Sequence, residues 1–282
     1  MTSQLHIIAA YKNHMTYLKH SYGKQPFKLA NITEEKKCGL LQLMIMSSSP
    51  GVLDNDNYSI EISIEENAKV HLTTQGYQRL FAMRNKAAQY MNVRVHDKAS
   101  FCFLPHPNVP HATSDFSSAN NIYLHKNHNL VWSEIITCGR KLSGEEFKFT
   151  RYHNVTNVYL NNKLVVKENV LLEPLKKNVH AIGQLEGYTH QSTLLFINDH
   201  ADMKKISSAC KELLSGIEDI IFGISELPIN GLICRLLGQK SEKLFNCNNN
   251  LALLIQRFLR NDKKIEPEII SCGTRLRISE NL

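Results

Sequence analysis

Three segments of the sequence combine turn-forming residues with side chains that could bind a cation or hold a charge. In the first, residues 47–56, Pro50-Gly51 forces a tight turn and Asn55 precedes Asp56. Asparagine tolerates the left-handed backbone conformation, so Asn55 is expected to aim the Asp56 carboxylate in a fixed direction. The alternative is that Asp56 closes an Asx turn and has a purely structural role.

The other two segments carry polar groups at the ends of expected strands. Thr74 and Gln75 end an alternating strand, and their hydroxyl and amide groups either satisfy neighbouring backbone or line a polar interior. Glu134 stands among the apolar residues of 130–136, and a buried carboxylate needs a hydrogen-bond partner or a proton. Arg140 follows, and its planar guanidinium can pair with a carboxylate through two hydrogen bonds.

Thirteen histidines are a further source of metal-binding groups. His106 with His111, and His125 with His128, stand close enough along the chain to bind a transition metal through imidazole nitrogens. The competing interpretation is that these are ordinary surface residues of loops. Because the chain has no C-x-x-C pair, a closed structural zinc site is not indicated. A transient contact is the natural expectation for a protein that passes a metal onward.

The familiar catalytic motifs are missing. The chain contains no G-x-x-x-x-G-K-[ST] phosphate loop, no G-x-G-x-x-G dinucleotide turn, no H-E-x-x-H metal helix and no G-x-S-x-G nucleophile elbow. The sequence therefore predicts a protein that is not an enzyme. A small-molecule enzyme whose paired carboxylates or Cys-His pair meet only on folding stays open as another class of function.

The composition is that of a globular protein, with 43% hydrophobic and 21% charged residues. The net charge of +7 is spread along the chain and does not form the basic stripe of a nucleic-acid-binding protein. No apolar run reaches the roughly 20 residues that span a bilayer, and the first residues do not resemble a signal sequence. We therefore expect a cytoplasmic protein without nucleic-acid or membrane partners. Most of the seven scattered cysteines are expected to be buried free thiols.

A strand-turn-strand unit recurs in the middle of the chain. Residues 59–74 show it clearly, with two strands of period two around a polar turn. The turn positions Ala68, Ala99 and Asn129 are spaced 31 and 30 residues apart, and residues 157–166 read as a shorter fourth copy. We expect each unit to be a hairpin and the units to stack as a solenoid-like β-sandwich, since each must cover its neighbour's apolar face. The alternative is an ordinary sandwich of consecutive hairpins.

The pattern changes after about residue 195. Apolar residues recur at helical spacing behind Asn198 and Asp199, which are expected to cap a helix, and again over 244–258, which predicts a second helix. Two strands are expected between these helices. The sequence thus predicts one mainly β domain in three parts, namely a repeat-built β body (1–195), an α/β part (196–260) and a tail (261–282).

Several short motifs follow one another in a characteristic order. They are Ser49-Pro50-Gly51, Asn55-Asp56, Leu72-Thr73-Thr74-Gln75, Leu104-Pro105 with Pro110, Glu134, Gly139-Arg140, Gly144-Glu145, Gly187-Tyr188-Thr189-His190, Leu227-Pro228, Gly231-Leu232-Ile233-Cys234-Arg235 and Leu237-Gly238. In this order they resemble the urease accessory protein family UreD, called UreH in some bacteria. The resemblance runs from about Gly23 to the second predicted helix. Val52 and Asn55 depart from it, because the family usually has glycine at both positions.

Resemblance to UreD implies a non-catalytic chaperone for urease maturation. The implied fold is mainly β, with strands of two sheets in a helical stack and two C-terminal α-helices. The implied partners are the urease structural subunits, UreF and, through UreF, the GTPase UreG, which would account for the missing phosphate loop. Nickel would be handled transiently on its way to the urease active site, with no tightly bound cofactor.

The resemblance also implies particular residues for a polar passage. The residues implied for transient nickel contact are Asp56, Glu134 and Glu145. Those implied for the passage or for partner contact are Thr74, Gln75 and Arg140. Carboxylates and neutral polar groups lower the desolvation cost of a doubly charged ion without holding it tightly. Two questions stay open: whether nickel crosses the interior or an interface, and whether the chain is instead a repeat-built protein-interaction module with no role in metal transfer.

Overall fold

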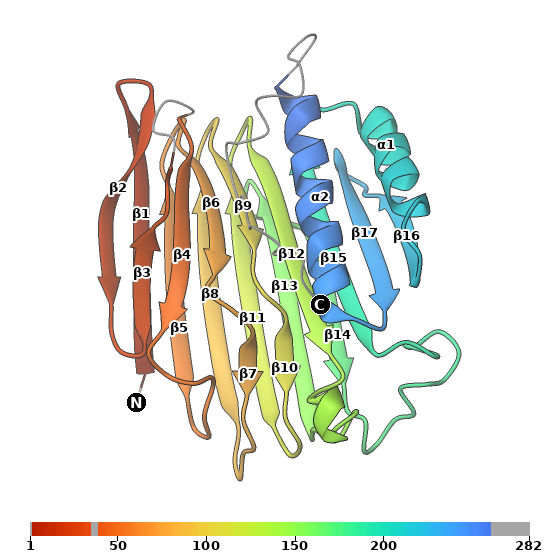
Figure 1. Cartoon of the computed structure of the whole chain (residues 1–282). Helices are drawn as coiled ribbons and strands as arrows, with labels where there is room; N and C mark the ends of the chain where they lie inside the picture. Colours follow the sequence, from red (N-terminus) through yellow and green to blue (C-terminus); the bar gives the residue numbers. More distant parts are fainter. Residues whose placement is uncertain (1, 35–38, 261–282) are drawn as a thin grey trace.

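The computed structural model describes residues 2–34 and 39–260, and the predicted tail at 261–282 lies outside them. The chain is mainly β, as the sequence predicts, with two mixed sheets and two helices in its C-terminal part. Figure 1 shows strands following one another across the molecule, with both helices at the end reached last by the chain.

The first sheet has seven strands. In spatial order they are β14 (Lys163–Leu172), β13 (Arg151–Leu160), β11 (Asp115–Leu124), β8 (Ala87–Val95), β5 (Asn57–Ile64), β1 (Thr2–Lys12) and β2 (Met15–Gly23). The pairs from β13 to β1 are parallel, whereas β14 and β2 pair antiparallel at the two edges. The sheet is thus a parallel stack with an antiparallel strand at each end.

The second sheet has ten strands. Its main path is β16 (Ile220–Glu226), β17 (Gly231–Gly238), β15 (His190–Asn198), β12 (Asn129–Thr137), β9 (Ser100–Leu104), β6 (Lys69–Thr74), β4 (Leu41–Ser47) and β3 (Phe27–Asn31). The short strand β10 (Asn108–Pro110) lies beside this path and pairs with β12 and with β7 (Gln78–Leu80). The central pairs are again parallel, and the pairs toward both edges are antiparallel.

The prediction that each repeat unit is a hairpin is wrong, because its two strands lie in different sheets. β5 belongs to the seven-stranded sheet and β6 to the ten-stranded sheet, and the same alternation holds for β8 with β9 and β11 with β12. Each strand pairs with its counterpart in the next unit, as Ile62 does with Val93 and Leu72 with Phe103. The turns therefore lead the chain from one sheet across to the other.

A left-handed residue in each turn makes this crossing possible. The third position of the turns 65–68, 96–99 and 125–128 has a φ of 62° at Asn67, 55° at Lys98 and 55° at Asn127. The repeat is also less regular than predicted. Since Asn129 and Lys69 both pair with Ser100, they are equivalent, and Asn129 is not the counterpart of Ala68.

Residues 157–166 are not a fourth copy of this unit. They belong to β13 and β14, which are neighbours in one sheet and pair antiparallel as a true hairpin. Asn161 and Asn162 form its tip with φ values of 49° and 63°. Two successive left-handed residues are the mark of a type I′ turn, whose twist returns the chain along the same sheet.

The two sheets share one hydrophobic core. In β5, buried and less buried residues alternate strictly, so that Ile60, Ile62 and Ile64 face the ten-stranded sheet. That sheet contributes Leu72 and Phe101, among others, to the same cluster. Burial of alternate side chains from both sheets is the main force that holds the layers together.

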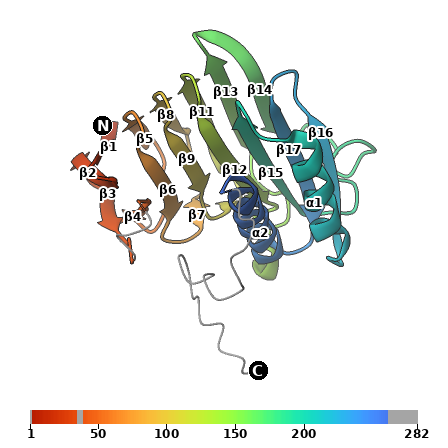
Figure 2. The same ribbon diagram turned by 90° about the horizontal axis from the view of Figure 1, so that it is seen from above.

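A second core lies on the other side of the ten-stranded sheet. The helices α1 (Met203–Ser215) and α2 (Ser241–Leu259) cover that side, as Figure 2 shows from above. β12 is therefore buried on both faces and reads as a nearly continuous apolar run. On β12, Val131 and Ile135 point to the helices, and Trp132 and Ile136 point to the seven-stranded sheet.

The first helix is confirmed, but its predicted cap is wrong. Asp202 caps α1, and its side chain accepts a hydrogen bond of 3.1 Å from the N–H of Lys205. The Asn198 side chain closes a turn before the helix by accepting from Ala201, and Asp199 accepts from a distant turn. All three residue types are good caps, so the sequence could not rank them without the turn geometry.

Five of the seven cysteines are buried free thiols, as predicted: Cys102, Cys138, Cys210, Cys234 and Cys247. Cys38 and Cys272 lie outside the described residues. Among the helices of the described part, none is long and apolar enough to cross a lipid bilayer.

The turn geometry gives a stability prediction. An ordinary residue in the left-handed conformation is strained by about 1–2 kcal/mol, and asparagine tolerates this conformation better. Lys98→Asn is therefore expected to raise the free energy of unfolding by about 0.5–1 kcal/mol in urea denaturation. The matched control is Lys126→Asn, one turn later and outside the left-handed position. A gain in the control equal to that of Lys98→Asn would contradict this explanation.

Candidate functional site

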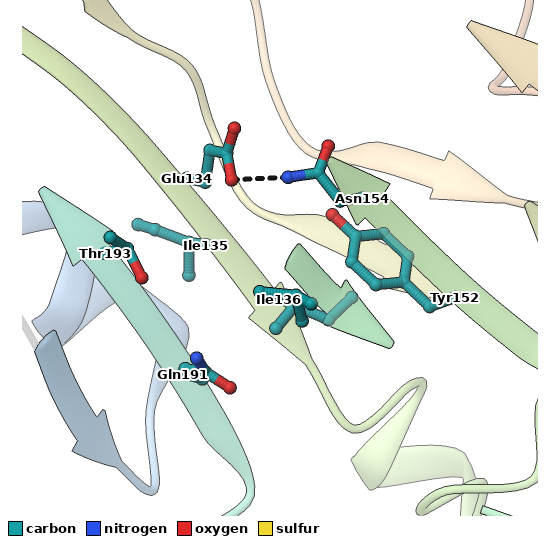
Figure 3. Close-up of a pocket in the computed structure, with 8 residues that line it drawn as sticks. Glu134, Ile135, Ile136, Tyr152, Asn154, Gln191 and Thr193 are labelled. Carbon is teal, nitrogen blue, oxygen red and sulfur yellow. Dashed lines mark hydrogen bonds between the residues drawn. The ribbon is translucent and has the colours of Figure 1, made fainter. Parts of the chain in front are cut away.

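Glu134 lies between the two sheets, where it accepts hydrogen bonds from four side chains. Trp132 Nε1 of its own strand β12 donates at 2.8 Å, and Asn120 Nδ2 of β11 donates at 3.3 Å to the same oxygen. Asn154 and Thr156 of β13 complete the set. Figure 3 shows Glu134 and Asn154 pointing toward one another from opposite sheets.

The donors are in place because polar residues occupy inward positions of otherwise alternating strands. In β11 the inward residues are Phe116, Ser118, Asn120, Ile122 and Leu124, and in β13 they are Tyr152, Asn154, Thr156 and Val158. Parallel register sets Asn120 beside Thr156, and Asn120 Nδ2 lies 3.0 Å from the Thr156 hydroxyl. The result is a buried hydrogen-bonded network around one carboxylate.

Burial of the Glu134 carboxyl group outweighs its hydrogen bonds and favours the protonated form. Burial raises the pKa of Glu134, and the hydrogen bonds from Thr156 and Trp132 act in the opposite direction. Glu168, whose charge also raises the pKa of Glu134, is paired with Arg235 through bonds of 2.7 and 2.8 Å. Four neutral donors thus surround the Glu134 carboxyl group.

A small cavity adjoins the carboxylate. It leaves about 10 Å³ for the centre of a water molecule, roughly the room that one water requires. Its walls come from four strands and include Glu134, Ile136, Tyr152, Asn154, Gln191 and Thr193. Asn108 donates to the Tyr152 hydroxyl at 3.2 Å, and its Oδ1 is buried without a partner among the described residues. The cavity thus has several polar groups in its wall and room for about one water molecule.

Asp56 does not belong to the Glu134 network. It lies in the predicted turn within residues 47–56. Its Oδ2 accepts from the Leu53 N–H and from the Tyr58 hydroxyl, both at 2.7 Å. Asn55 has a φ of 64°, which confirms the left-handed conformation predicted for it. Burial and the bond to Asp56 raise the pKa of Tyr58. The carboxylate therefore bonds within its own loop, although to the N–H of an earlier residue and not to the later N–H of an Asx turn.

Arg140 and Glu145 pair with each other through the guanidinium fork. Arg140 Nε donates to Glu145 Oε2 at 2.9 Å and Nη2 donates to Oε1, and the Ala112 N–H adds a bond of 3.1 Å. The pairing with Arg140 lowers the pKa of Glu145 to about 2. Gly139, with a φ of 116°, lets this loop close, since a Cβ there would lie 2.3 Å from the Glu145 carbonyl oxygen.

Thr74 and Gln75 also bond to near neighbours and not to Glu134. The Thr74 hydroxyl accepts from the His106 N–H at 2.9 Å and lies 3.1 Å from His106 Nδ1. The Gln75 side chain is exposed, and its backbone N–H donates to Ile45. His106 stacks on Phe245 of α2, with ring centroids 4.4 Å apart.

The predicted site residues other than Glu134 nevertheless lie at one end of the stacked strands. β5 begins after Asp56, β6 ends at Thr74 and β12 ends before Arg140, so all three loops leave the end opposite the turns 65–68. Hydrogen bonds tie these loops into a chain, from Val52 to Arg79, from Leu80 to His111 and from Ala112 to Glu145. We call residues 48–56, 74–86, 105–114 and 138–150 the loop end.

Sequence reasoning missed most of the Glu134 network. Asn120, Asn154, Thr156 and Tyr152 are inward residues of β11 and β13, which extend further than the strands expected there. The signal that could have identified them is a polar residue at a core-facing position of a strand with period-two alternation. No group of three or more His, Cys, Asp or Glu side chains is arranged to hold a metal in residues 2–34 and 39–260.

The ion pair of the loop end gives a pH prediction. A carboxyl group whose pKa is lowered on folding stabilises the protein above its unfolded pKa, and this stability is lost as pH falls through the folded pKa. Arg140→Gln should move the pKa of Glu145 from about 2 toward 4.5, measured by carboxyl-carbon NMR titration. The variant should also lose less stability than the parent between pH 5 and pH 2. An unchanged Glu145 titration would contradict the role assigned to Arg140.

Comparison with known proteins identifies the family. The family described as UreD urease accessory protein matches residues 1–271. Urease accessory protein UreD of Flavobacterium johnsoniae is 47% identical over 250 residues, covering 87% of this chain and 89% of the relative. The UreD protein of Acetivibrio thermocellus is 36% identical over 243 residues, covering 86% and 92%. The chain therefore belongs to the UreD family of urease accessory proteins.

Proposed function

We propose that this protein is a cytoplasmic chaperone that helps to deliver nickel to the active site of urease. In this proposal it catalyses no reaction and acts as a scaffold for the urease structural subunits and UreF, with UreG joining through UreF. Membership of the UreD family supports a role in urease maturation. Nickel is the cargo, and the protein holds it only in passing.

The observation that carries the nickel part of the proposal is the Glu134 network. One carboxylate, flanked by neutral amide and hydroxyl groups and a water-sized cavity, offers a cation a polar environment inside an otherwise apolar core. Since four donors already occupy the carboxylate, a cation would gain little net binding energy there. Such a site favours transfer over storage.

The loop end supports the scaffold part of the proposal. We assign Asp56, Thr74, Gln75, Arg140 and Glu145 to partner contact or to the entrance of the nickel route. Gln75 and Arg140 are exposed, and the two carboxylates are fixed by local bonds that orient them. The alternation of strands between the sheets supports a helically stacked, solenoid-like body that holds this loop end rigidly beside Glu134.

Glu134→Gln tests the nickel route. The substitution removes the negative charge and keeps the shape, although an amide cannot accept all four hydrogen bonds, which should cost about 1–3 kcal/mol of stability. We expect the variant to co-purify with UreF and the urease subunits but to lower urease activation about tenfold, equivalent to about 1.4 kcal/mol. Thermal unfolding with and without partners separates this effect from loss of fold.

Glu66→Gln is the matched control, because it removes one charge from an exposed turn far from the loop end. It should leave activation unchanged. Full activation with Glu134→Gln would favour the alternative of an interaction module without a role in metal transfer. Failure of the unaltered protein to bind either UreF or urease subunits would overturn the scaffold itself.

A further inference from the structure

Three large aliphatic side chains project far into solvent at one end of the molecule. In residues 2–34 and 39–260, the most exposed large apolar side chains are Leu142 at 104%, Ile182 at 97% and Leu175 at 71%. The next one, Tyr90, is 52% exposed. Single exposed apolar residues are common on protein surfaces, but three such side chains on two adjacent loops need an explanation.

The two loops leave the same end of the strands. Leu142 belongs to the short 3-10 helix η2 (Lys141–Ser143) in the loop end. Leu175 and Ile182 belong to residues 173–189, which join β14 to β15 and which we call the 173–189 loop. β14 ends beside the start of β13, and β15 begins beside the end of β12. The 173–189 loop therefore lies at the loop end (Figure 1).

Two contacts join the loops to each other. The Phe147 ring packs edge-on against the His180 ring, with the centroids 5.3 Å apart. Lys141 Nζ donates to Gln239 Oε1 at 3.2 Å, and Gln239 Nε2 donates to the Gly187 carbonyl oxygen at 2.5 Å. The exposed aliphatic side chains thus belong to one connected surface.

The 173–189 loop holds Ile182 in a defined position. Val179 and Leu185, on either side of it, are buried in the core between the sheets. The Leu185 N–H donates to the Val179 carbonyl oxygen at 2.9 Å, and the Gly183 N–H donates to the Glu186 side chain at 3.2 Å. A loop that is already ordered loses little conformational entropy on binding, which favours affinity.

The backbone around Leu142 is held in a comparable way. The Arg140 carbonyl oxygen accepts from the Ser143 N–H at 2.9 Å and from the Glu145 N–H at 3.1 Å. The guanidinium of Arg140 also binds the Glu145 carboxylate. Leu142 therefore extends from an ordered turn, as Ile182 does.

The charges beside these side chains are largely balanced within the molecule. Lys141 pairs with Glu146 at 3.6 Å, and Lys176 pairs with Glu173 at 2.8 Å. The other charged residues of the 173–189 loop are one of each sign, Lys177 and Glu186. A surface with exposed aliphatic groups and little net charge fits an apolar patch on a partner better than a charged one.

We propose that Leu142, Leu175 and Ile182 are the apolar anchors that bind UreF. This inference rests on the proposed function, in which the protein partners are UreF and the urease structural subunits. A chaperone releases its client when maturation is complete, whereas a second accessory protein can stay bound from one client to the next. Long-lived interfaces are more apolar than transient ones, so fully exposed aliphatic anchors suit UreF better than urease.

The position of the anchors relates this interface to the nickel route. Tyr152 and Gln191, in the wall of the cavity beside Glu134, are each the second residue of a strand. Those strands are β13, which follows residues 138–150, and β15, which follows the 173–189 loop. With UreF on the anchors, the strand ends that line the cavity lie next to the interface.

The affinity of the full chain for immobilised UreF, measured by biolayer interferometry, tests the anchors. We expect Leu142→Ser and Ile182→Ser each to weaken the UreF affinity about tenfold or more, because each prevents the burial of one aliphatic side chain. Both variants should unfold at the temperature of the parent, since the replaced side chains are exposed. Leu164→Ser is the matched control, because Leu164 is 44% exposed at the opposite end of β14 and should not affect UreF binding.

Hydrogen exchange of the unaltered protein gives a readout that needs no variant. UreF should slow amide exchange in residues 141–144 and 178–184 and leave the hairpin tip at 161–162 unchanged. Equal UreF affinity of the parent and both variants, or unchanged exchange in both loops, would overturn the assignment.

Other occupants of this surface give different results. Loss of binding to the urease subunits with full UreF affinity would mean that the anchors bind the client, which contradicts the assignment to UreF. A dimer of the parent alone that Ile182→Ser dissociates would identify a second copy as the occupant. If the parent itself does not bind UreF, the proposed function fails, and that outcome is distinct from variants that bind as the parent does.

Discussion

Parallel pairing of equivalent positions is the constraint on which the rest of this structure depends. Because β5, β8 and β11 pair in register, and β6, β9 and β12 do likewise, a residue type at one place in the repeat acquires a spatial neighbour from the next. Asn92 and Asn121 bond across two strands in this way, and Asn121 bonds to Asn157. A single register rule thus generates apolar rows inside and polar rows outside.

The same rule explains how a carboxylate can lie between two apolar layers. An isolated ionised group there would be strongly destabilising, but neighbouring strands set Asn120, Asn154 and Thr156 around Glu134. These groups are uncharged, so the network satisfies the carboxylate without a permanent counter-ion. That is a different solution from Glu145 and Glu168, each of which is matched to an arginine. The interior carboxyl group is thus satisfied by neutral groups, and the two outer carboxylates are satisfied by charged partners.

Local patterns in the sequence predicted what depends on local forces. The period-two strands, both helices, the left-handed Asn55 and the ability of Arg140 to pair with a carboxylate follow from residue type and spacing. The partners of each strand could not be predicted. A hairpin and a turn that crosses between sheets both show two strands of alternating polar and apolar residues joined by a polar turn. The difference is one left-handed residue at Asn67 against two at Asn161 and Asn162. The three Glu134 donors on β11 and β13 were not predicted for a related reason, since they are 14 to 22 residues from Glu134 along the chain.

The antiparallel strands that flank both sheets limit how far the stack can extend. A column of parallel strands presents an unpaired edge that could template another copy and grow into a fibre. Here the parallel column of the first sheet stops at β1 and β13, where β2 and β14 turn back along the edge. The parallel column is therefore bounded on each side by one antiparallel strand, in the position that a terminal repeat takes in other repeat arrays.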